Sequence, residues 1–65
     1  MVMINLKKLR QERNLSQNDV ATNLNISQNH YSNIEIGNRK PSVNIAKKIA
    51  EFYGFEAEWF KLLER

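Results

Sequence analysis

The sequence predicts an all-α domain made of five short helices. Glycine and proline are scarce, runs of β-branched residues are missing, and apolar residues recur at helical spacing along the whole chain. A length of 65 residues suits one small domain, expected to span residues 1–65. Because a chain of this size buries only about 60% of its surface on folding, the core is expected to be thin.

The first helix is expected to bring arginines and leucines to the same side. Four residues share that side at helical spacing: Leu6, Leu9, Arg10 and Arg13. Asn14 follows at a position where a left-handed residue is expected, and asparagine is the residue best tolerated there after glycine. The first helix should therefore end at this residue.

The second helix opens with a capping signal. The Ser16 hydroxyl can accept from a free backbone N–H, and Asp19, three residues on, completes a capping box. The apolar stripe of this helix consists of Val20, Ala21 and Leu24. Asn25 and Ile26 are then expected to form a tight turn before the next helix.

The third helix is expected to begin after a cap at Ser27 and to stop at Gly37, which suits a left-handed conformation. Tyr31 and Ile34 are separated by three residues, so both should point inward. The helix from residue 28 to residue 36 then presents the opposite side to solvent.

A basic loop precedes the fourth helix. Pro41 disfavours a helical residue before it, and Ser42 caps the helix that follows. Helical spacing makes five residues of this helix inward-facing: Val43, Ala46, Ile49, Ala50 and Tyr53. Gly54 ends it, and residues 55–63 form a short aromatic last helix.

Charge and composition narrow the function. The formal net charge is +3, but residues 1–48 hold eight Lys and Arg against three acids, a balance of +5, whereas residues 49–65 carry −2. The first two-thirds should therefore attract polyanions. No cysteine is present, which excludes disulfides, thiolate zinc sites and cysteine nucleophiles. No apolar run is long enough to span a bilayer, so the protein is expected to be soluble and cytoplasmic.

Catalysis and cofactors are not expected. His30 is the only histidine, so a metal site of several imidazoles is excluded, and the carboxylates near the end of the chain have no nucleophile or histidine partner. An active site also needs a walled pocket, which so short a chain offers poorly. We therefore expect no enzyme activity, no metal, no cofactor and no small-molecule ligand.

The order of these motifs resembles the phage repressor and Cro-like helix-turn-helix family, often called Xre. The resemblance is carried by Leu-Ser-Gln, Ile-Ser, Ile-Glu-x-Gly and Lys-Pro-Ser, and extends from LKKLR to GFEAEWF. It implies a lambda-repressor-like domain whose second and third helices form the helix-turn-helix, at about residues 16–36. Two departures are Asn14 and Asn25, where the family often has glycine. A third is Tyr31, which replaces an aliphatic residue and needs a partner for its hydroxyl.

The resemblance implies that the third helix enters the major groove of DNA. With Tyr31 and Ile34 inward, the outward side carries polar residues and Ile36, and the expected base-reading residues are Gln28, Asn29, Ser32 and Asn33. Asparagine and glutamine match the acceptor and donor that adenine shows in that groove. The alternative is that these amides are ordinary solvated side chains. His30, on the flank of the helix, is expected to be a surface residue.

A second group of residues is expected to contact phosphates. Gln17 lies near the start of the second helix, where exposed N–H groups and the helix dipole favour anions. The resemblance places further backbone contacts around the start of the fourth helix. The full set is Gln17, Ser27, Asn38, Arg39, Lys40 and Asn44. Such contacts position a domain on DNA and do not select sequence.

An internal ion pair is also expected. Glu35 falls on the inward side of the third helix, about 40° from Tyr31 at about 100° per residue, and a buried carboxylate needs a partner. Helical spacing offers both Arg10 and Arg13 as that partner. The family resemblance selects Arg10, whose pairing with Glu35 would fix the third helix against the first.

The expected function is sequence-specific binding of double-stranded DNA by a transcriptional regulator, a repressor or Cro-like protein, acting as a homodimer on a two-fold symmetric operator. The candidate dimer contact consists of Phe55, Trp59, Phe60 and Leu63, although these aromatic residues could instead close the core. The alternative function is an antitoxin, or an activator that contacts RNA polymerase, whose main role is a protein–protein interaction.

Overall fold

The computed structural model describes residues 5–64, with side chains up to Leu63, and these residues confirm the all-α class. The helices are α1 (Leu6–Glu12), α2 (Gln17–Leu24), α3 (Gln28–Glu35), α4 (Val43–Tyr53) and η1 (Glu56–Glu64). The last of these is a 3-10 helix. The expected domain limits, 1–65, include chain ends outside the described residues and stay a prediction.

Side-chain caps start every α-helix. The hydroxyls of Ser16, Ser27 and Ser42 each accept from the backbone N–H three residues on, as predicted, and Asn5 caps α1 in the same way. The capping box is also present, because the Asp19 carboxylate accepts from the Ser16 backbone N–H at 2.9 Å. Local sequence therefore sets where each α-helix begins.

Left-handed residues separate the helices. Asn14 and Asn25 have φ angles of 56° and 61°, and Gly37 and Gly54 have φ angles of 86° and 87°. The left-handed conformation was predicted for Asn14 and Gly37, a tight turn was predicted at Asn25, and only the end of a helix was predicted at Gly54. The turn between α2 and α3 is consequently short, and it fixes the angle at which α3 leaves α2.

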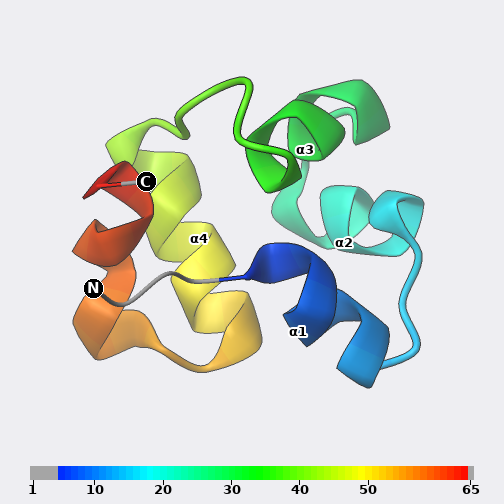
Figure 1. The fold of residues 1–65 in the computed structure, drawn as a ribbon, viewed down its shortest axis with the longest axis horizontal. Coiled ribbons are helices and arrows are strands. Elements are labelled where there is room, and N and C mark those ends of the chain that lie inside the picture. Colours follow the sequence, from blue (N-terminus) through cyan, green and yellow to red (C-terminus); the bar gives the residue numbers. More distant parts are fainter. Residues whose placement is uncertain (1–4, 65) are drawn as a thin grey trace.

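Four of the helices form two packed pairs. Helices α2 and α3 pack together at the right of Figure 1, and η1 packs along α4 at the left. The segment 36–42 runs across the top of this view from the end of α3 to the start of α4. This arrangement puts α3 at the end of the molecule remote from η1. One side of α3 is therefore open to solvent.

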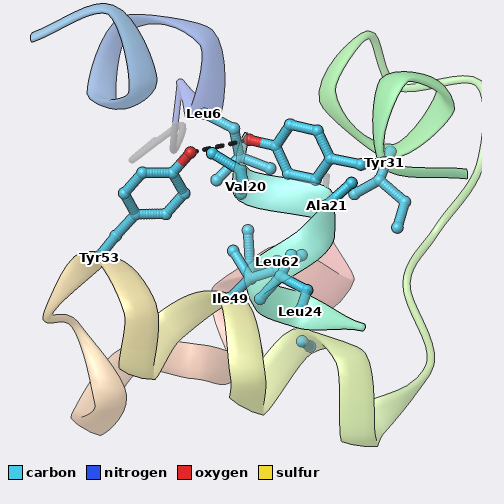
Figure 2. Packing of buried hydrophobic residues seen from close by; sticks show 10 residues of the cluster. Leu6, Val20, Ala21, Leu24, Tyr31, Ile49, Tyr53 and Leu62 are labelled. Carbon is cyan, nitrogen blue, oxygen red and sulfur yellow. Dashed lines mark hydrogen bonds between the residues drawn. The ribbon is translucent and has the colours of Figure 1, made fainter. Parts of the chain in front are cut away.

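The core lies between these two pairs (Figure 2). It contains Leu6, Val20, Ala21, Leu24, Tyr31, Ile34, Ala46, Ile49, Tyr53 and Leu62. Of the five residues expected to face inward on α4, Val43 is a wrong prediction, since it is 47% exposed. Val43 lies about 90° from the centre of the stripe formed by Ala46, Ile49 and Tyr53, in the first turn of the helix.

The last helix departs from α-helical spacing. Its backbone is kinked at Glu58, where φ is −120°, and the rest follows 3-10 geometry with three residues per turn. Trp59 and Leu62 are three residues apart, so both turn toward α4. Leu62 is fully buried as a result. Its neighbours Trp59, Phe60 and Leu63 were predicted from the sequence as candidate contact residues, but Leu62 was not.

Candidate nucleic-acid interface

One side of α3 is polar and open to solvent. Gln28 and Asn29 are exposed, Ser32 and Asn33 are half-buried, and Ile36 at the end of the helix is 63% exposed. The opposite side, with Tyr31, Ile34 and Glu35, is buried. The predicted inward and outward sides of this helix are therefore confirmed.

An open hollow of about 410 Å³ lies beside this polar side. Its lining consists of Gln17, Gln28, Asn29 and Ser32. Three of these were predicted to read bases, and Gln17 was predicted to contact phosphate. The start of α2 and the first turns of α3 thus form one continuous polar surface.

The amide side chains of α3 differ in the hydrogen bonds that they make. Among the described residues, the side chains of Gln28 and Asn29 make no hydrogen bond, so donors and acceptors remain available. The Asn33 side-chain amide donates to the Asn29 carbonyl at 3.0 Å. Asn33 therefore keeps one N–H and its oxygen for an external partner.

The predicted Arg10–Glu35 pair is present behind this surface. Arg10 Nε donates to Glu35 Oε2 at 2.9 Å and Arg10 Nη2 donates to Glu35 Oε1 at 3.0 Å, which is a bidentate pair. The two side chains are 13% and 2% exposed. Arg10 Nη1 also donates to the Leu15 carbonyl at 2.8 Å. Helix α3 is thus tied to α1 and to the segment before α2.

Arg13, the other candidate partner, has a different contact. Its Nη2 donates to the Tyr53 carbonyl at 3.1 Å, and its guanidinium lies 5.2 Å from the centre of the Tyr53 ring. Arg13 is exposed, yet it joins the end of α1 to the end of α4. The choice of Arg10 from the family resemblance was therefore correct.

The ion pair remains charged at neutral pH. Burial alone would raise the pKa of Glu35, but the hydrogen bonds and charge of Arg10, with hydrogen bonds from Gln17 and Tyr31, lower it below its ordinary value. The hydrogen bond to Glu35 raises the pKa of Arg10 in turn, against the effect of burial. Both shifts favour the ionised pair.

Gln17 has a contact that sequence reasoning missed. Its side-chain amide donates to Glu35 Oε1 at 3.4 Å, a long hydrogen bond that connects the polar surface to the ion pair. The Gln17 oxygen and its second N–H stay available. The sequence indicated that the inward-facing Glu35 needs partners. It could not show that Gln17 is one of them, because the start of α2 and the end of α3 are brought together only by the fold.

The remaining candidate phosphate ligands lie just before α3, in the segment that follows α3, and in the first turn of α4. Asn38, Arg39 and Lys40 are exposed on the segment between α3 and α4, and Asn44 is exposed in the first turn of α4. The Ser27 hydroxyl oxygen accepts from the His30 backbone N–H at 3.0 Å, so its own proton is still available to an acceptor. His30 itself is half-buried on the flank of α3.

The candidate dimer residues fall into two kinds. Phe55, Trp59 and Leu63 are half-buried and pack against the core, and the Lys47 ammonium lies 4.9 Å from the centre of the Trp59 ring. Phe60 is 44% exposed. Three of the four residues thus help to close the core, and Phe60 is the most exposed of the four.

Within residues 5–64, acidic, histidine and cysteine side chains form no group of three that could hold a metal ion. The helices of this part of the chain are all too short or too polar to span a bilayer.

Comparison with known proteins identifies a family model and relatives that are all of the helix-turn-helix (HTH) type. A helix-turn-helix family model matches residues 6–60. The uncharacterized HTH-type transcriptional regulator YqaF of Bacillus subtilis is 47% identical over 51 residues, which are 78% of this chain and 67% of YqaF. An uncharacterized HTH-type transcriptional regulator of Methanocaldococcus jannaschii is 42% identical over 53 residues, covering 82% of this chain and 80% of that protein.

A phage protein is also similar. The cryptic phage CTXphi transcriptional repressor RstR of Vibrio cholerae is 37% identical over 49 residues, which are 75% of this chain but 44% of RstR. The chain thus spans less than half of that repressor. No solved structure matches the chain significantly.

Proposed function

Because this chain belongs to the phage repressor and Cro-like family of helix-turn-helix proteins, we propose that it is a transcriptional regulator that binds a specific double-stranded DNA sequence. In this proposal α3 is the reader helix, which enters the major groove. Repression, as in the phage relative's name, is the regulatory outcome that we propose.

The observation that carries the proposal is the open amide side of α3. Gln28 and Asn29 are exposed, unpaired within the described residues, and held on a helix whose other side is buried. The helix backbone that carries these amides is already fixed, so only their side-chain rotamers must be ordered when they bind base edges. The expected partner is adenine, whose N7 and N6 pair with an asparagine or glutamine amide.

Phosphate contacts would hold the reader helix in the groove. Gln17 lines the same hollow as Gln28, and the exposed Arg39 and Lys40 follow the other end of α3. The candidate contacts therefore flank both ends of the reader helix. Arginine and lysine at phosphates supply affinity that depends on salt and not on sequence.

A homodimer is the assembly that we propose. A single reader helix contacts few base pairs, and a two-fold pair of them would read half-sites about one helical turn, ~34 Å, apart. The exposed Phe60 on η1 is the candidate centre of the dimer contact, with Trp59 beside it at a ring distance of 6.5 Å. Sedimentation should show self-association that Phe60→Ser weakens, and a monomer at tens of micromolar would contradict a stable dimer.

Selection from a random duplex pool tests DNA reading directly. The wild-type chain should enrich a defined sequence with two-fold related half-sites. Gln28→Ala and Asn29→Ala should relax the choice at one or two positions, each costing about 1–3 kcal/mol of discrimination. Asn23→Ala is the matched control, because Asn23 is an exposed amide near the far end of α2.

Two results would contradict the proposal. The first is equal affinity for duplexes of any sequence, or for single strands, at two salt concentrations. The second is that Gln28→Ala and Asn29→Ala both enrich the same sequence as the wild type. That result would show that these two residues do not read bases, although the chain would still bind DNA.

A further inference from the structure

The buried side of α3 is joined to α4 by a hydrogen bond between two tyrosines. Tyr31 is fully buried, and its hydroxyl oxygen lies 2.8 Å from that of Tyr53, as the dashed line in Figure 2 shows. Tyr31 is the largest of the fully buried side chains among the described residues. Its hydroxyl needed a partner, and an α4 residue 22 positions away supplies it.

The same buried side of α3 also carries the ion pair. Tyr31 lies one helical turn before Glu35, whose carboxylate accepts from Arg10 Nε and Nη2. Either tyrosine hydroxyl can be the donor in the Tyr31–Tyr53 hydrogen bond. Helix α3 is therefore held from α4 by this hydrogen bond and from α1 by the ion pair.

Tyr53 is itself held in place. Its carbonyl accepts from Arg13, whose guanidinium lies over its ring, and the ring stacks with Phe55 at 6.5 Å between centres and 3° between planes. Its side chain therefore has contacts on α1 and beyond the end of α4. A hydroxyl fixed in this way sets a definite position for the group that it contacts.

We propose that Tyr53 is a positioning residue for the reader helix. Its hydroxyl fixes the rotation of α3 relative to α4, and so the placement of the amide side of α3 relative to the phosphate ligands between the two helices. The inference rests on the proposed function, because positioning is meaningful only if α3 reads DNA. It extends that function to a residue outside the polar surface.

The variant Tyr53→Phe separates positioning from stability. It removes the hydroxyl of Tyr53 and keeps its ring, so the ring contacts with Arg13 and Phe55 remain. The Tyr31 hydroxyl loses its partner on α4, which lowers stability, so binding is compared where both proteins are fully folded. Tyr31→Phe is less suitable, because it changes a residue of the reader helix itself.

The experiment measures sequence discrimination by the folded chain. Dissociation constants are measured for the selected duplex and for the same duplex with one base pair changed, at a temperature where circular dichroism shows full folding. A single mismatch is expected to weaken wild-type binding by roughly 5- to 150-fold. Tyr53→Phe should reduce that ratio by about threefold or more, with unchanged affinity for random duplex.

The matched control is Ile49→Val, which removes a methyl group from a fully buried α4 residue that takes no part in the hydrogen bond between the tyrosines. It should lower the melting temperature and keep the discrimination ratio within about twofold of wild type. Equal loss of discrimination in both variants, or no loss in Tyr53→Phe, would overturn the positioning role alone. Failure of the wild-type chain to select any duplex would overturn the proposed function and this inference with it.

Discussion

Glu35 is a nearly buried carboxylate whose charge is balanced by Arg10. The substitution Glu35→Ala would leave two N–H groups of the guanidinium without their acceptor in a site that is 13% exposed. Removing one partner of a buried pair is strongly destabilising, so we expect a loss of about 3 kcal/mol in the free energy of unfolding. Urea denaturation measures this loss.

The matched control is Glu58→Ala. Glu58 pairs with Lys61 on η1, where the two side chains are 52% and 26% exposed, and an exposed pair contributes little. Its loss should stay within about 0.5 kcal/mol. Equal losses in the two variants would show that the Arg10–Glu35 pair does not brace the fold.

Acid should destabilise the fold through the same carboxylate. The pKa of Glu35 is lower in the folded state than in the unfolded chain, and so is the pKa of Asp19, which accepts from the Ser16 backbone N–H. A lowered folded pKa stabilises the fold above the unfolded pKa, and this stabilisation is lost as the pH falls through the folded value. Stability should thus be flat from about pH 7 to about pH 5 and should fall below that.

Melting curves of wild type and Glu35→Gln between about pH 7 and about pH 3 measure this effect. The variant has no carboxyl group to titrate at position 35, so its melting temperature should fall less steeply in acid. A steeper fall for the variant than for wild type would show that Glu35 is not held ionised by the fold.

At the scale of elements, the turn between α2 and α3 depends on one backbone conformation. Asn25 has φ of 61°, which costs most L-residues roughly 1–2 kcal/mol but costs asparagine and glycine less. Asn25→Ala should therefore lower the free energy of unfolding by about 1 kcal/mol, and Asn25→Gly should change it by less than about 0.5 kcal/mol. Thermal melting with Thr22→Ala, an exposed helical control, checks the difference. If Asn25→Ala were as stable as Asn25→Gly, the left-handed conformation would not be what selects the residue at this position.

The helices whose starts are encoded locally were predictable from sequence. Serine caps, left-handed asparagines and the 3.6-residue period each act within a few residues, so Ser16, Ser27 and Asn25 were sufficient to place α2 and α3. The last helix was less predictable, because its 3-10 period depends on packing against α4. That period buries Leu62 and leaves Phe60 exposed, which α-helical spacing did not indicate.

The candidate interface also has features that local sequence encodes and features that depend on the fold. The amide side of α3 could be predicted, because Tyr31 and Ile34 fix which side is inward. The contacts of Glu35 with Gln17 and of Tyr31 with Tyr53 join residues 18 and 22 positions apart, and no local pattern shows them. The need for a partner at Tyr31 was predictable from its buried hydroxyl, but the identity of that partner required the fold.

At the scale of the whole molecule, positive charge is concentrated in residues 1–48, with a balance of +5, whereas residues 49–65, which include η1, carry −2. Helices α2 and α3 contain no lysine or arginine, so the basic side chains of residues 1–48 lie on or beside α1, between α3 and α4, and on α4. Helix α3 lies at the opposite end of the view in Figure 1 from η1, and the asymmetry is carried there by Arg39 and Lys40, which follow α3 in the chain. Such a distribution would attract a polyanion to the segment that follows α3.

This asymmetry predicts the salt dependence of DNA binding. Each phosphate neutralised by a lysine or arginine contributes about 0.9 to the slope of log affinity against log salt, so Arg39→Ala and Lys40→Ala should each reduce the slope by about 1. Affinity should fall equally for selected and random duplexes, since these contacts do not read bases. Lys48→Ala is the control, because Lys48 lines a hollow between α2 and α4 with Glu51 and should leave the slope unchanged. If Lys48→Ala lowered the slope as much as Arg39→Ala, then the attraction would come from total charge, and the segment between α3 and α4 would not be the phosphate contact.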